Sequence, residues 1–120
     1  GWHLPSDLEW KTLELFIGLK TEEFENTNHR GENLAQLLKA EELWIGGDKG
    51  TNNFKFSAIP AGAVLFYDES FHFKDEKAYF WTSTQDNSDA IARVLSYDDT
   101  FIERAFFSKK NKMSVRCVKD

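Results

Sequence analysis

Oxygen-bearing side chains gather in two short polar segments, which are the best candidates of this sequence for binding a ligand. One segment reads STQDNSD at 83–89, and the other reads SYDDT at 96–100. Carboxylate and amide oxygens can coordinate calcium. Asp and Asn are also the residues that favour tight turns. Turn formation explains both segments without an ion, so we predict no metal site and keep weak calcium binding as an open alternative.

The residues that could carry out catalysis are isolated from one another. The three histidines form no HxxxH or HxH pair, and the single cysteine, Cys117, has no partner at zinc-ligand spacing. Ser83 has no histidine near it in the sequence, so a Ser–His–Asp relay is not indicated. Adjacent acids such as Asp98 and Asp99 point in different directions, unlike the opposed carboxylates of a glycosidase. The sequence therefore predicts neither an enzyme nor a cofactor.

A binding face is the remaining possibility, and a strand expected at 101–107 is part of it. Phe101, Ile102, Phe106 and Phe107 put large apolar groups on both faces of this strand, because successive side chains alternate. Either other elements cover both faces, or an aromatic ring is exposed. An exposed ring beside polar groups would suit a sugar or a peptide. The predicted ligand-binding residues are Gln85, Asp86, Asn87, Arg93, Tyr97, Asp98, Asp99 and Phe101.

Length and charge limit the alternatives. A chain of 120 residues forms one domain. The net charge is −5, but residues 101–120 carry six cations against two acids, which leaves −9 for the remainder. This acidic remainder would repel a phosphate backbone, so we predict no nucleic-acid partner. No apolar run approaches the length of a membrane span.

Two helices are expected at the start of the chain. Ser6 and Glu9 have the spacing of a capping box, and an apolar stripe follows that predicts a helix ending near Leu19. A second, shorter helix is predicted within GENLAQLLKAEEL at 31–43, followed by a glycine-rich loop, GGDKGTNN, at 46–53.

After this loop the periodicity changes to two, which indicates strands. Phe54, Phe56 and Ala58 alternate with polar residues, and short strand candidates separated by turn residues follow. These candidates are Ala63–Tyr67, Phe71–Phe73, Ala78–Thr82, Ala90–Tyr97, Phe101–Phe107 and Met113–Val118. Helices followed by antiparallel strands indicate the α+β class. In the last strand the alternation turns Cys117 inward, as a buried free thiol or as half of a disulfide.

Four motifs in the same order and at plausible spacings carry a resemblance to a known family. They are GWHLPSDLEW, GTNNFKFSAIPAG, YFWTSTQ and SVRCVKD, and they extend from the first residue to the last. The chain resembles the Fibrobacter succinogenes major paralogous domain family. The resemblance implies a C-type-lectin-like fold, with two N-terminal helices and then a twisted antiparallel sheet with long loops. It also implies that residues 1–120 are a single domain from a longer surface or secreted protein.

The resemblance also shapes the functional expectations. It implies an extracellular module at a bacterial surface, often within a lipoprotein, that presents loops 84–89 and 97–101 to a glycan or protein without catalysing a reaction. The alternative is a spacer with no ligand, and an enzyme related to formylglycine-generating folds is less favoured, because that chemistry needs two cysteines. Paired chain ends are expected, with Trp2, Trp10 and Trp81 as packing residues. The resemblance further implies that Cys117 pairs with a cysteine upstream of Gly1, as oxidising surroundings would allow.

Overall fold

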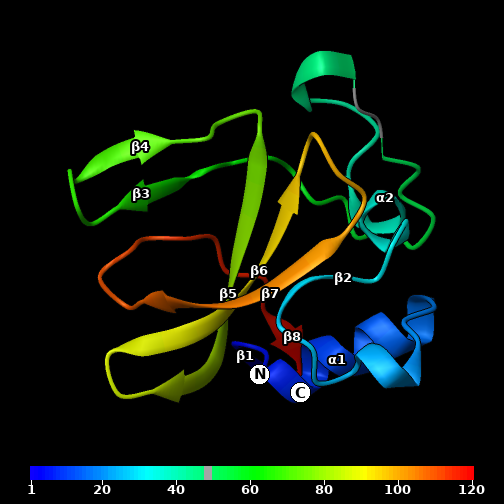
Figure 1. Cartoon of the computed structure of the whole chain (residues 1–120), viewed down its shortest axis with the longest axis horizontal. Helices are drawn as coiled ribbons and strands as arrows, with labels where there is room; N and C mark the ends of the chain where they lie inside the picture. Colours follow the sequence, from blue (N-terminus) through cyan, green and yellow to red (C-terminus); the bar gives the residue numbers. More distant parts are fainter. Residues whose placement is uncertain (48–49) are drawn as a thin grey trace.

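A computed structural model describes residues 1–47 and 50–120 and has the predicted α+β architecture (Figure 1). Its centre is a four-stranded antiparallel sheet with the strand order β2-β7-β6-β5. Two further antiparallel pairs, β3 with β4 and β1 with β8, lie outside this sheet. The strands are β1 (Trp2–His3), β2 (Asn28–Arg30), β3 (Ala63–Leu65), β4 (Ser70–His72), β5 (Lys77–Asp86), β6 (Asp89–Ser96), β7 (Ile102–Ser108) and β8 (Val118–Lys119).

The helices follow the sequence signals closely. In α1 (Asp7–Ile17) the Ser6 hydroxyl accepts from the Glu9 backbone N–H and the Glu9 carboxylate accepts from the Ser6 N–H, which confirms the capping box. The helix ends before the predicted Leu19, because Gly18 takes a positive φ of 122°. The second predicted helix is the short α2 (Leu34–Leu38). Two 3₁₀ turns complete the set, η1 (Thr21–Glu23) and η2 (Ile45–Gly47).

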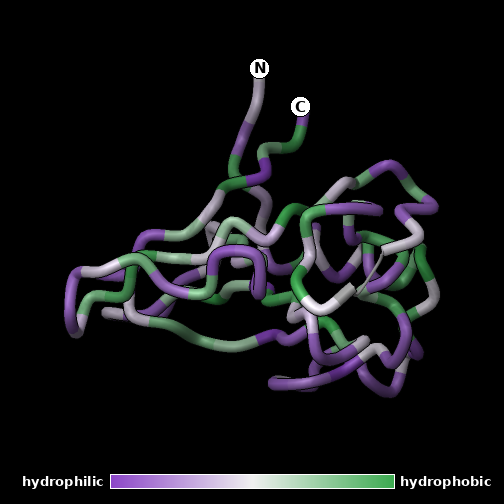
Figure 2. The backbone as a smooth tube through the Cα atoms, turned by 90° about the horizontal axis from the view of Figure 1, so that it is seen from above, coloured by the Kyte–Doolittle hydropathy of each residue, from purple (hydrophilic) through white to green (hydrophobic). Residues whose placement is uncertain are grey.

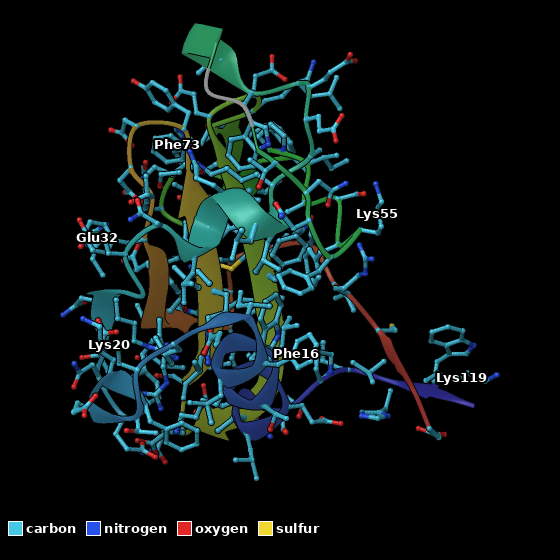
Figure 3. All side chains as sticks on the ribbon, turned by 90° about the vertical axis from the view of Figure 1, so that its right-hand side faces the viewer. Phe16, Lys20, Glu32, Lys55, Phe73 and Lys119 are labelled. Atoms are coloured by element: carbon cyan, nitrogen blue, oxygen red, sulfur yellow. The ribbon has the colours of Figure 1, made fainter. Side chains whose placement is uncertain are left out.

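The sheet is covered on both faces. Both helices lie over one face, as Figure 3 shows, and Trp10 of α1 packs there against Phe80 in the larger apolar cluster. Tyr79, the neighbour of Phe80, belongs to a second cluster with Ala63 and Val94. Successive side chains of β5 therefore contribute to a different apolar cluster on each face of the sheet. Because both faces are covered, β6 is buried along nearly its whole length.

Five of the predicted strands are present in order, although β5 continues to Asp86 beyond the predicted Thr82, and two further strand predictions are wrong. The segment Phe54–Ala58 is a loop, because Lys55 and Ser57 adopt left-handed φ values of 57° and 56° that no strand allows. The segment Met113–Val118 forms only isolated bridges before β8, so its alternation does not set side-chain direction, and Cys117 is exposed instead of buried. In the predicted glycine-rich loop, residues 48 and 49 lie outside the described residues.

The chain ends lie side by side, as predicted. Trp2 is the register partner of Lys119, and the Asp120 backbone N–H donates to the Gly1 carbonyl at 3.0 Å. Figure 2 shows both ends leaving the body of the protein together. Because this pair projects, Trp2 is 68% exposed and does not pack, contrary to the prediction, while Trp10 is 3% exposed, as predicted. Trp81 is half-buried. We call β1 and β8 together the terminal ribbon.

Candidate functional site

The predicted ligand residues do not form one surface. Gln85 and Asp86 end β5, and Asn87, with a left-handed φ of 49°, begins a two-residue turn into β6. Tyr97 and Asp98 follow the other end of β6. Eight residues of strand separate the two groups by about 23 Å. The expected long loop at 84–89 is thus a tight hairpin.

The second group has local partners of its own. An Asp99 carboxylate oxygen lies 3.3 Å from His29 Nε2, and the other oxygen accepts from the Phe101 backbone N–H at 2.9 Å. The Phe101 ring meets the His29 ring edge-on at 5.9 Å and is half-buried. Tyr97 is 37% exposed and Asp98 is exposed. These contacts hold the β6–β7 connection in place.

Arg93 lies in the interior and is closed to a ligand from solvent. It is fully buried, and its guanidinium donates to Glu14 through Nε at 2.5 Å and to Asp7 through Nη1 at 2.8 Å. Arg104 also clasps Asp7, through Nε at 3.0 Å and Nη2 at 2.8 Å, and Arg30 donates to Glu14. We call these five side chains the buried ion cluster; it ties α1 to β2, β6 and β7.

The buried ion cluster had a signal in the sequence that the ligand-face interpretation missed. Asp7 and Glu14 fall two helical turns apart, on the same face as Trp10 and Ile17, which is the buried face. Arg93 interrupts the otherwise apolar run of β6. A charged side chain within an apolar stripe is buried together with that stripe, so it needs a partner in the protein interior. Burial acts to raise the pKa of Asp7, but hydrogen bonds from Arg104 and Arg93 outweigh it and hold that pKa well below its usual range.

One histidine has a serine and an aspartate beside it, but not in the geometry of a catalytic relay. His72 Nε2 lies 3.0 Å from Ser70 Oγ and 2.8 Å from Asp68 Oδ2, so both oxygens share one ring nitrogen. A relay needs the nucleophile and the acid on different nitrogens. The three residues therefore stabilise the exposed turn between β3 and β4. In the described part of the chain, no group of His, Cys, Asp and Glu could hold a metal ion.

An apolar hollow of the surface lies between α1 and the segment that leads into β8. It has a volume of about 380 Å³ and is lined by ring, aliphatic and a few polar side chains. We call it the terminal groove; its lining residues are Pro5, Glu9, Trp10, Thr12, Leu13, Phe56, Arg116 and Val118. None of them was predicted as a ligand residue.

Two rings of the groove lining, Trp10 and Phe56, form a rigid aromatic floor because they pack against each other and against Phe80. The Trp10, Phe56 and Phe80 ring centroids lie 5.6–5.7 Å apart. Phe56 reaches this position because the neighbouring backbone turns through the left-handed values that broke the predicted strand. In Figure 3 the terminal ribbon, labelled at Lys119, projects away from α1, and the loop that carries Lys55 lies on the same side of α1, nearer α2.

Apolar groups continue beyond the terminal groove. Phe16 on α1 is 75% exposed and meets the exposed Phe54 ring edge-on at 5.5 Å. Trp2, Val115 and Val118 are exposed on and before the terminal ribbon. Such a run of exposed rings around an apolar hollow is typical of interaction sites.

His3 fastens the terminal ribbon to α1 beside this groove. Its Nδ1 lies 2.6 Å from an Asp120 carboxylate oxygen and its Nε2 lies 2.6 Å from a Glu9 oxygen. A neutral imidazole has one N–H, so only the imidazolium donates to both carboxylates. Hydrogen bonds to Glu9 and then to Asp120 raise the pKa of His3.

A pH titration should reveal this fastening. Because the folded pKa is raised, the contribution of His3 is complete below pH 6.5 and is lost as the pH rises through the folded pKa. We expect an NMR titration to place the pKa of His3 above 6.5, with faster amide exchange in β8 at higher pH. Glu9→Gln keeps the capping box and should lower the pKa of His3. An ordinary pKa in both proteins would contradict the bridge.

The position of the exposed Cys117 limits the geometry of its predicted disulfide. Cys117 directly precedes Val118, whose register partner is His3, so a straight continuation of β1 beyond Gly1 leads away from the thiol. Disulfides join Cα atoms within about 7 Å. A partner upstream of Gly1 would therefore belong to a chain segment that folds back over the terminal ribbon.

Comparisons with known proteins agree with the resemblance. The sequence pattern of the Fibrobacter succinogenes major domain matches residues 1–119. Searches of curated proteins and of solved structures found no match to the chain. No helix in the described residues has the length and apolar character required to cross a bilayer.

Proposed function

We propose that this chain, which belongs to the Fibrobacter succinogenes major domain family, is a non-enzymatic module that binds a protein segment in the terminal groove. The module acts outside the cell, at a bacterial surface, and has a C-type-lectin-like fold. The two helices, the antiparallel sheet and the paired chain ends are the features that support this fold assignment.

The single observation that carries the proposal is the apolar groove with a rigid aromatic floor. A floor of interlocked rings costs little conformational entropy when a ligand settles on it. Sugars need several convergent hydrogen-bonding groups, whereas an aliphatic or aromatic side chain needs an apolar recess. The lining of the terminal groove favours the side chain. The ligand is therefore a protein segment and not a glycan.

A blocking substitution tests this assignment. Peptides selected from a random phage-displayed library on the 120-residue chain are titrated into labelled protein and followed by NMR. We expect shifts at α1, β8 and the Phe56 loop. Thr12→Trp fills the groove from an exposed helix position and should weaken binding at least tenfold, a loss of about 1.4 kcal/mol. Thr27→Trp, also exposed but outside the groove, should bind as the parent protein does.

The other outcomes distinguish the alternatives. Selection of no peptide, together with an empty glycan array, would favour the spacer. Binding on the glycan array alone, or peptide shifts confined to the hairpin of β3 and β4 (the β3–β4 arm), would reject the groove as the protein-binding site.

A further inference from the structure

We propose that the segment bound in the terminal groove carries a carboxylate, an Asp or Glu next to its apolar side chain, which pairs with Arg116. This inference rests on the proposed function and names the chemical class of its ligand. It follows from the position of one cation, from the occupation of the only acid in the described groove lining, and from the charges around the groove.

Arg116 is arranged to receive an anion at the wall of the groove. Its guanidinium carbon lies 4.5 Å from the centroid of the Phe56 ring, and the residue is exposed. Stacking occupies a face of the planar guanidinium and leaves its N–H groups, which lie in the plane, for a carboxylate. Across the described ranges 1–47 and 50–120, Arg116 forms no ion pair within the chain.

The acid in the groove lining is committed elsewhere. One Glu9 oxygen contacts His3 Nε2 at 2.6 Å, and the other accepts from the Ser6 backbone N–H at 2.8 Å and from the Ser6 hydroxyl at 3.1 Å. The backbone hydrogen bond from Ser6 and the bond to His3 lower the pKa of Glu9. Its negative charge is thus balanced within the capping box and the terminal ribbon, and Arg116 retains an unmatched positive charge.

Two exposed lysines near Arg116 have the same sign as its charge, and the nearby acids Glu9 and Asp120 are paired with His3. Lys119 lies three residues after Arg116, and Lys55 precedes Phe56, against whose ring Arg116 packs; both lysines are exposed and labelled in Figure 3. Local positive potential of this kind attracts acidic segments and orients them. An apolar peptide with a basic neighbour would be disfavoured for the same reason.

A double-mutant cycle tests the pairing. One selected peptide and its Glu→Gln (or Asp→Asn) version are titrated by NMR or calorimetry against the parent protein and Arg116→Gln. We expect each single change to weaken binding about tenfold, and the second change to add little once the first is present. Lys110→Gln, an exposed cation outside the groove, should leave the affinity for both peptides unchanged. The advantage of the acidic peptide should shrink as salt is added.

The results of these titrations distinguish this inference from the proposed function on which it rests. Equal binding of the two peptides in the groove, or selected peptides without an acid next to the apolar side chain, would overturn the inference and leave the groove as a protein-binding site. An acidic preference that persists in Arg116→Gln would place the carboxylate elsewhere and would also overturn it. Peptide binding that Thr12→Trp does not reduce would reject the groove itself.

Discussion

Replacement of Glu14 by Gln is expected to destabilise the protein by about 3–5 kcal/mol, the range for removing one partner of a buried ion pair. Glu14 is fully buried and accepts from Arg93 at 2.5 Å and from Arg30 at 2.5 Å. Glutamine keeps the size of the side chain but removes its charge, so two buried guanidinium groups lose their shared counter-ion. Burial already lowers the pKa of Arg30, which shows that its environment opposes the positive charge.

Urea unfolding of the variant and of a matched control measures this effect. Glu22→Gln makes the same chemical change at an exposed position in η1, and its free energy of unfolding should stay within about 0.5 kcal/mol of the parent value. Similar unfolding midpoints for the two variants would show that the buried ion cluster does not hold α1 on the sheet.

The sequence predicted the fold correctly where a local pattern is compatible with only one local structure. The capping box at Ser6 and Glu9 has no common alternative use, and it places the start of α1 correctly. The largely apolar segments of β5 and β6 fit strands with both faces covered, and both strands are present in order, although β5 continues to Asp86, beyond the predicted Thr82. Local backbone rules of this kind do not depend on contacts between distant parts of the chain.

Short patterns failed where tertiary contacts decided the conformation. The Phe56 ring packs against Trp10 and Phe80, but the backbone that carries it is a loop. The alternation of apolar residues at Phe56 therefore does not indicate a strand. Before Cys117 the chain pairs with β3 at Lys112 and with β5 at Ser114, each time through a single bridge. No continuous ladder of strand pairs therefore enforces a period of two.

The candidate site was less predictable than the fold because its residues come from distant segments. The terminal groove combines Leu13, Phe56 and Val118, which only the tertiary structure brings together. The predicted face instead relied on residues near each other in sequence, and β6 carries those residues to its opposite ends. Arg93 looked available because one sequence cannot show that α1 covers it.

Replacement of Gly62 by Ala is expected to cost about 2–5 kcal/mol, since two penalties add. Gly62 has a left-handed φ of 71°, which costs an L-residue with a Cβ about 1–2 kcal/mol. An added Cβ would also lie 2.2 Å from the His72 carbonyl oxygen and 2.8 Å from the Lys74 nitrogen. Both atoms belong to backbone, so the end of β4 must move, at a further cost of about 1–3 kcal/mol.

Gly46→Ala separates the two penalties, because Gly46 has a φ of 70° but an added Cβ would find the Tyr97 ring at an ordinary 3.6 Å. Its cost should be only the left-handed part, about 1–2 kcal/mol. Equal unfolding free energies for the two variants in urea would contradict the close approach of Gly62 to β4. Below its melting temperature, Gly62→Ala should still bind a groove peptide with the parent affinity, because the β3–β4 arm contributes no residue to the terminal groove. A Gly62→Ala variant that loses stability but keeps its affinity for the peptide would therefore show that the β3–β4 arm stabilises the fold without contributing to ligand binding.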